Sequence, residues 1–199
     1  PRAPVATVNV TLNTSNGIAT MPAGTAFTTS VDGVSFQFVT INDVTGQNTG
    51  NSIPFDGTKI YEGTYTKTKY LVDSNDVDQR FILQDVRADT TTLTVKVQNS
   101  ATDTTTTTYT KATDITQLSS VSTVYFLQEV DGGRFEIYFG DGATSKAVED
   151  GNIVVLSYVI TNKTAANGAA AFSSPSSIDG NTNITVTTVA NAVGGGEPE

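Results

Sequence analysis

The chain has 199 residues, with 11 lysines and arginines against 20 aspartates and glutamates, a formal net charge of −9, and no histidine or cysteine. Without those two residue types it cannot form a disulfide, an imidazole or thiolate metal site, a cysteine nucleophile or a Ser-His-Asp triad. Carboxylate chemistry, hydroxyl chemistry or a structural role remain, and the length allows one large β domain or two small ones.

Charge and hydropathy also limit the partners. An acidic chain with few cations and no tryptophan offers no basic stripe for phosphates and no indole to stack on bases, so we expect no nucleic-acid partner. No apolar stretch approaches the length that crosses a bilayer, so we expect no membrane partner. No cofactor is predicted either.

Apolar residues alternate with polar ones in several segments, as in strands with one buried face. In chain order, the clearest of these are residues 6–12, 34–38 and 93–97. Residues 125–127 and 135–139 flank Asp131-Gly132-Gly133, which predicts a hairpin because Asp-Gly supplies the positive φ of a tight turn.

The remaining elements complete an all-β prediction. Residues 153–160 are nearly all apolar, which indicates a strand buried on both faces, and Ile184 and Val186 begin a last strand. Residues 113–118 are expected to form one helical turn, capped by Thr113 or Asp114. No longer helical periodicity is present, so little helix is expected.

Composition shifts divide this β chain into two sandwich-like or barrel-like modules. Residues 43–56 and 162–180 are rich in small and polar residues and are predicted to be loops. Residues 1–56 and 169–199 are therefore predicted to form one discontinuous β domain. The second β domain, residues 57–168, would be inserted into it.

Two groups of carboxylates allow alternative interpretations. Asp73, Asp76 and Asp78 supply the oxygen ligands that calcium prefers, but their spacing is not that of an EF-hand, and a solvated turn is the favoured interpretation. Asp141 lies between two glycines, with Glu136 and Glu149 as the nearest acids for glycosidase-type catalysis. The alternative, which we favour, is a turn with positive φ at Gly140 and Gly142 in which Asp141 bonds backbone N–H groups.

Threonines and tyrosines suggest surfaces rather than catalysis. The run 104–108 is five threonines, which fits an edge strand or hairpin tip, with a glycan-binding surface as the alternative. Tyrosines are enriched at protein interfaces because the ring is apolar and the hydroxyl polar. The candidates for partly exposed interface anchors are Tyr61, Tyr65, Tyr70, Tyr109 and Tyr125.

A longer pattern is more specific than composition. A strand ends in Phe139-Gly140-Asp141-Gly142, Gly151 precedes a strand that carries Tyr158, and a loop with Asn167 follows. In this order the segments strongly resemble the baseplate J-like family, wedge proteins of contractile phage tails, and most closely its T-even-type wedge subunits. The resemblance spans roughly residues 5–199, including 21–27 and the glycine-rich stretch 189–199.

The resemblance implies a structural, non-catalytic subunit of a virion. Such a late protein would assemble in the host cytoplasm into the tail baseplate wedge, pair as a homodimer, and join other wedge proteins and ring neighbours around the hub. The ring would rearrange when the sheath contracts. Because the chain begins at Pro1 and ends shortly after a glycine triplet, we expect it to be a fragment of a longer protein.

Two other classes of function remain open. One is a threonine-rich β-sandwich adhesin or carbohydrate-binding module of a virion or cell surface, which usually carries clustered exposed aromatics. The other is a polysaccharide-degrading tail enzyme, which requires two carboxylates facing each other across a cleft.

Overall fold

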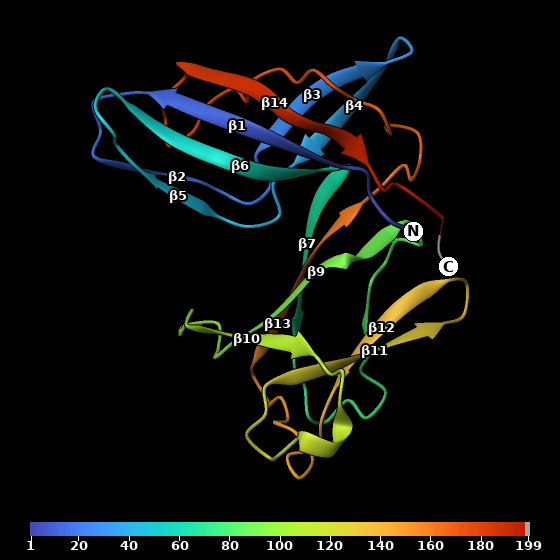
Figure 1. Cartoon of the computed structure of the whole chain (residues 1–199). Helices are drawn as coiled ribbons and strands as arrows, with labels where there is room; N and C mark the ends of the chain where they lie inside the picture. The colour runs from blue at the N-terminus through green and yellow to red at the C-terminus, as the bar shows by residue number, and fades with distance from the viewer. Residues whose placement is uncertain (198–199) are drawn as a thin grey trace. The chain divides into compact units, whose positions relative to one another are not determined.

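The computed structural model describes residues 1–197, and they are almost entirely strands and turns (Figure 1). This confirms the predicted all-β class. Within these residues the one named helical element is the 3-10 turn η1 (Ile115–Gln117), and its N-cap Asp114 accepts a hydrogen bond from the Thr116 N–H at 2.9 Å. The turn and one of its two predicted caps are therefore confirmed. Residues 1–197 contain no helix long and apolar enough to span a bilayer.

Two compact units divide the chain. Unit 1 consists of Pro1–Thr66, Asp89–Thr92 and Val159–Glu199, and unit 2 consists of Lys67–Ala88 and Leu93–Tyr158. The last two residues of unit 1, like the end of the predicted segments 169–199 and 189–199, lie outside the described residues. The units are divided after Thr66 and before Val159. The predicted domain boundaries, between residues 56 and 57 and between residues 168 and 169, concern independently folding domains and stay a prediction.

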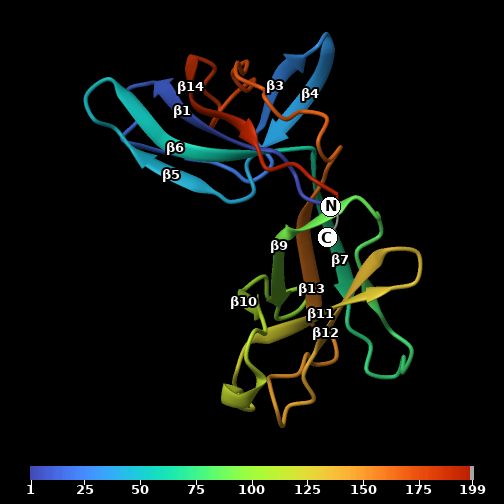
Figure 2. The same ribbon diagram turned by 45° about the vertical axis from the view of Figure 1, so that its right-hand side comes forward.

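A curled five-stranded sheet forms most of unit 1 (Figure 2). Its spatial order is β14 (Ile184–Val193), β1 (Val5–Asn13), β6 (Ser52–Glu62), β4 (Val34–Val39) and β3 (Ala26–Val31). The alternation predicted for residues 6–12 is confirmed, since the even-numbered residues of β1 from Ala6 to Leu12 are at most 1% exposed. A two-stranded sheet, β2 (Ile18–Met21) and β5 (Val44–Gln47), accompanies it.

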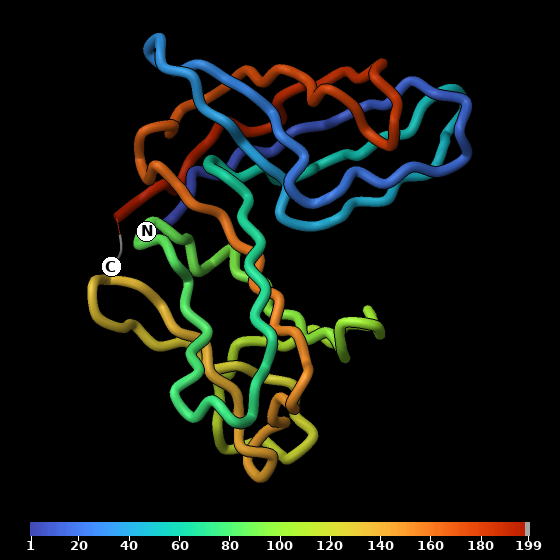
Figure 3. The backbone as a smooth tube through the Cα atoms, turned by 180° about the vertical axis from the view of Figure 1, so that it is seen from behind, coloured from blue at the N-terminus to red at the C-terminus, as the bar shows by residue number. Residues whose placement is uncertain are grey.

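The segment between β13 and β14 bonds both edge strands of the unit 1 sheet, β14 through Ala192 and β3 through Thr28, and it can be followed in orange in Figure 3. Ala166, Ala169 and Ile178 of this segment are buried in the unit 1 core, and the Phe172 ring meets Phe38 edge-on at 4.9 Å between centroids. No named strand falls within 162–180, which confirms the predicted loop. A loop that packs apolar residues into a half-open sheet closes the core without another strand.

Two sequence-based expectations for unit 1 are wrong. Residues 43–56 are not one loop, because they contain β5 and the start of β6, and only the stretch between these strands turns. Val34 is 56% exposed rather than buried, because it follows the left-handed Asp32-Gly33 turn at the tip of the β3–β4 hairpin.

A seven-stranded sheet forms most of unit 2, and three of its strands also supply residues to unit 1. Its order is β7 (Thr64–Leu71), β13 (Ile153–Ile160), β9 (Ala88–Gln98), β10 (Thr106–Lys111), β11 (Val124–Val130), β12 (Arg134–Phe139) and β8 (Phe81–Ile82). Six consecutive residues of β13, Val154 to Val159, are buried, which confirms the prediction for this strand.

The β11–β12 hairpin is also confirmed. Gly132 and Gly133 have φ of 80° and 73°, the left-handed conformation that the Asp-Gly turn was expected to need. The threonine run lies on the β9–β10 hairpin, as expected. Thr106, Thr107 and Thr108 pair with β9, and the pairs of β10 with β11 begin at Thr110, after the run, so the register also agrees with an edge position.

Candidate interaction surface

The Phe139–Gly142 motif builds a turn after β12. Oδ1 of Asp141 accepts hydrogen bonds from the backbone N–H of Ala143 at 2.9 Å and of Thr144 at 3.1 Å. These bonds, first that of Thr144 and then that of Ala143, lower the pKa of the exposed Asp141 carboxyl. Gly142 has a φ of 85°, as expected, and its N–H donates to the carbonyl of Ser145 at 2.9 Å. The Asp141 carboxylate therefore fixes the backbone of its own turn.

Gly140 serves the turn differently from the sequence-based expectation. It is not among the glycines with positive φ. A Cβ at this position would overlap Oγ of Ser145 and lie 2.7 Å from its carbonyl oxygen, so Gly140 is required by close approach. Ser145 is fully buried, and its Oγ has no hydrogen-bond partner within residues 1–197.

We expect Gly140→Ala to lower the free energy of unfolding by about 2 kcal/mol, because Ser145 must be displaced. Urea unfolding followed by circular dichroism measures this. Ser145→Ala removes the unpaired buried hydroxyl and should be nearly neutral. The double variant should then lose at least about 1 kcal/mol less than the sum of the two single variants. Strict additivity would show that the Gly140–Ser145 contact does not decide the turn.

The other motif residues also have structural roles, and the structure does not gather them into one site. Gly151 has a φ of 80° and donates to the Val72 carbonyl at 2.9 Å. Tyr158 is 1% exposed in β13. Asn167 bonds the backbone of Gly195 twice, accepting from its N–H at 3.0 Å and donating to its carbonyl at 3.1 Å. Asn167 thereby holds the glycine-rich segment after β14.

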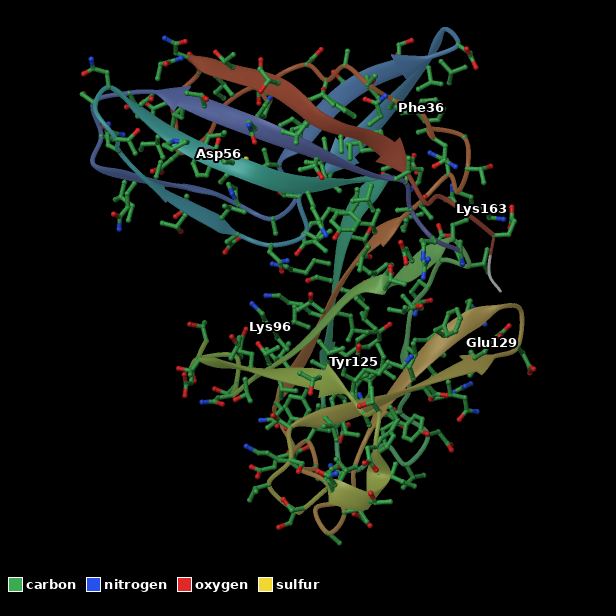
Figure 4. The ribbon with its side chains drawn as sticks, in the orientation of Figure 1. Phe36, Asp56, Lys96, Tyr125, Glu129 and Lys163 are labelled. Carbon is green, nitrogen blue, oxygen red and sulfur yellow. The ribbon has the colours of Figure 1, made fainter. Side chains whose placement is uncertain are left out.

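Two of the five tyrosines proposed as interface anchors are buried, so the expectation that they are partly exposed is wrong. Tyr109 and Tyr125 are 3% and 5% exposed, and burial raises the pKa of each phenol. Tyr109 is buried because β10 lies inside the sheet, where its ring meets Phe139 edge-on at 5.2 Å. Tyr125 lies at the start of β11, as labelled in Figure 4. Both belong to the unit 2 core.

Tyr61, Tyr65 and Tyr70 are half-buried, and each already has neighbours within the chain. The Tyr70 hydroxyl donates to the carbonyl of Ile82 at 2.6 Å. Burial, and secondarily the charge of Asp89, raise the pKa of Tyr61, which lines a shallow 250 Å³ depression. A partner contact at these three tyrosines stays a prediction.

Four aromatic rings form an edge-to-face row in unit 2. Tyr70 meets Phe81 at 5.7 Å between centroids, Phe81 meets Phe139 at 5.6 Å, and Phe139 meets Tyr109 at 5.2 Å. Edge-to-face pairs add to simple area burial because the positive ring edge faces a negative ring face. Phe139, the first motif residue, therefore joins the turn to the unit 2 core.

We expect Phe139→Ala to cost about 2–3 kcal/mol, below the 3–5 kcal/mol of a fully buried phenylalanine because its ring is only partly buried. The free energy of unfolding in urea measures the loss. Tyr138→Ala is the control on the same strand, since Tyr138 is 44% exposed. Equal losses for the two variants would contradict the assignment of Phe139 to the core.

Two of the candidate acids, Glu136 and Asp73, are bonded to partners near them. Glu136 forms a bidentate pair with Arg80, with N–O distances of 2.9 and 2.7 Å, and this pairing lowers the Glu136 pKa. Asp73 accepts from the N–H and side chain of Asn75 within an exposed turn. Across residues 1–197, no group of three carboxylates is placed to hold a metal ion. Glu136 thus serves an ion pair, and Asp73 serves a turn.

Sequence reasoning missed two kinds of feature. Phe126 and Tyr138 stack at 5.1 Å with their planes 17° apart, on the outer side of the hairpin whose tip lies near Glu129 in Figure 4. Their cross-strand register, readable from the hairpin turn, was the available signal. Glu62 and Asp89 are completely buried carboxylates, and no ion pair to either is found within residues 1–197. Nothing local in the sequence marks them.

Comparison with known proteins gives two matches. A family model described as bacteriophage baseplate wedge protein gp6, third domain, matches residues 66–171. These include every residue of the motif that ends with Asn167. The chain is also 26% identical over 208 aligned positions to baseplate wedge protein gp6 of Enterobacteria phage T4. The alignment covers 90% of this chain but only 30% of that protein's length.

Proposed function

The chain belongs to the bacteriophage baseplate wedge protein gp6 family, and we propose from this premise that it is a structural, non-catalytic part of a contractile-tail baseplate wedge. It contributes to the inner ring around the hub by contacts with further copies and with other wedge proteins. It assembles in the host cytoplasm and remains in the tail of the virion. The ring rearranges when the sheath contracts.

The observation that carries the proposal is the match of the family model to more than half of the chain, residues 66–171. The geometry agrees with it. Asp141 and Asp73 are bonded to backbone N–H groups of their own turns, and Glu136 is paired with Arg80. A chain whose acids stabilise turns and whose sheets present long strands is suited to act through interfaces.

Labelled tails test this role. A small tag is inserted in the exposed turn around Thr102 of the full-length protein, and that protein is supplied to infected cells in place of the phage's own copy. Electron microscopy should find the label in the baseplate, close to the tail axis, and displaced after contraction. Tails without label would contradict the proposal. Binding on a glycan array by the same protein would then favour the adhesin alternative.

A further inference from the structure

The sheets of this chain have several strand edges, and two of them, β3 and β7, carry a device that opposes further pairing. On β3, Ser173 donates its N–H to the Thr28 carbonyl at 2.8 Å, and the Thr29 hydroxyl bonds the Ala171 carbonyl at 2.6 Å, so a loop covers this edge. On β7, Lys67 and Lys69 are both exposed. Edge lysines oppose strand addition because pairing would desolvate them.

The end of β14 is protected as well. Its pairing with β1 shifts register twice, between Val5 and Thr7 and between Thr7 and Val8, which places bulges in the second half of β14. Beyond these bulges, Ala192 bonds the loop on its outer side, accepting from Gly168 at 2.7 Å and donating to Ala169 at 2.9 Å.

The first half of β14, residues 184–188, has none of these devices, and we call it the open edge. It pairs with β1 in regular register from Val8–Thr188 to Leu12–Ile184. The N–H of Asn13 donates to the Asn183 carbonyl, so residues 183, 185 and 187 direct their backbone groups toward β1. The backbone groups of Ile184, Val186 and Thr188 therefore point away from the sheet.

These outward groups are largely unused. Of the three residues, only Ile184 has a backbone bond on that side within residues 1–197, from its N–H to the Thr182 carbonyl. Side chains alternate across the strand: Ile184 and Val186 pack on the core, whereas Thr185 and Thr187 are exposed. No charged residue occurs between Asp179 and Glu197, in a chain of net charge −9.

We propose that the open edge pairs antiparallel with the open edge of a second copy of this chain, about a two-fold axis at Val186. Two like-charged copies can approach at a neutral stretch with little repulsion. In this register the N–H and carbonyl of Val186 bond those of its symmetry mate. Thr188 donates to Ile184, and Thr185 lies opposite Thr187, a favourable cross-strand pair.

This pairing deepens the proposed function and rests on it. Five residues per copy bury much less than the roughly 1,200 Å² of a stable interface. The contact therefore adds to assembly where copies are already concentrated. An isologous contact of this kind gives a pair, and a different surface is then required to close a ring.

Cross-linking tests the register, since the chain has no native cysteine. Opposed residues at a non-hydrogen-bonded position have Cα atoms about 4.5 Å apart, within the range of a disulfide. In the whole chain, an oxidised mixture of the Thr185→Cys and Thr187→Cys variants should form dimers at least about 10-fold faster than either variant alone. Ser35→Cys, at an exposed residue away from β14, gives the background rate. Equal rates in the mixture and in the single variants would overturn the proposal.

A charge exchange gives a second readout, with little risk to folding because both threonines are exposed. The Thr185→Cys variant keeps Thr187 on the open edge, and the Thr187→Cys variant keeps Thr185. The remaining threonine is replaced by Lys in one set of variants and by Glu in a second set. Mixtures within one set should cross-link slowly, and a Lys variant mixed with a Glu variant should recover the original rate. Equal slowing in every mixture would contradict the register.

Adding the other wedge proteins separates this proposal from the proposed function. Entry into a wedge complex without any cross-link would overturn the open-edge pairing and leave the wedge role intact. Cross-linking of a chain that does not enter a wedge complex would support the open-edge pairing and contradict the wedge role. A Thr187→Cys thiol protected in the complex, but never cross-linked, would assign the edge to a strand of a different protein.

Discussion

Gly63→Ala should destabilise unit 1 by about 4 kcal/mol or more, the largest loss expected for a single methyl group in this chain. Gly63 lies between β6 and β7 with a φ of 127°, a backbone conformation that alanine adopts only with strain. An added Cβ would overlap the Ile160 carbonyl oxygen and lie 2.7 Å from Cγ1 of Val159. Neither atom can move freely, because both belong to β13, whose neighbouring residues are buried.

A matched control separates steric overlap from backbone strain. Gly50 has a similar φ of 145°, but a Cβ there would meet nothing within 4 Å. Gly50→Ala should therefore cost only about 1 kcal/mol, from strain alone. Urea unfolding followed by circular dichroism measures both variants. Similar losses at the two glycines would contradict the close approach of Gly63 to β13.

Glu62→Ala should cost about 3–5 kcal/mol, because the Glu62 carboxylate is fully buried and satisfies three donors. It accepts from the Thr161 hydroxyl at 2.7 Å, the Asn162 N–H at 2.8 Å and the Asn162 side-chain amide at 2.7 Å. Alanine would leave the Thr161 hydroxyl without this acceptor inside the protein, and Asn162 would lose two hydrogen bonds. The carboxylate thus fixes the end of β13 to the end of β6 within unit 1.

Glu62→Gln distinguishes hydrogen bonding from volume. It keeps the shape but turns one acceptor into a donor that faces another donor, so a loss of about 1–2 kcal/mol is expected. Glu129→Ala, at an exposed position, should change the free energy of unfolding by less than about 0.5 kcal/mol. A Glu62→Ala variant as stable as Glu129→Ala would show that the buried network does not hold these strand ends together.

Strands with strong local patterns were predictable, whereas features decided by tertiary contacts were not. Alternation identified β1, an unbroken apolar run identified β13, and Asp-Gly identified the β11–β12 turn. In contrast, β5 is a short, glycine-containing strand that exists because β2 pairs with it along its length. Nothing in Val44–Gln47 alone distinguishes it from a loop.

In the candidate site, too, local features could be predicted and features decided by tertiary contacts could not. The role of Asp141 in its turn follows from local chemistry and was predicted. The burial of Tyr109 and the need for glycine at position 140 depend on Phe139 and Ser145, which meet these residues only in the folded sheet. Glu62 finds its donors about 100 positions away, and no local pattern marks such a contact.

Sedimentation velocity shows whether this chain acts as a baseplate wedge scaffold through protein contacts. The chain is measured alone over a range of concentrations and then mixed with the other wedge proteins, without any added ligand. In the mixture we expect a faster-sedimenting complex that contains this chain. A chain that sediments unchanged as a monomer beside assembled wedge proteins would contradict this role.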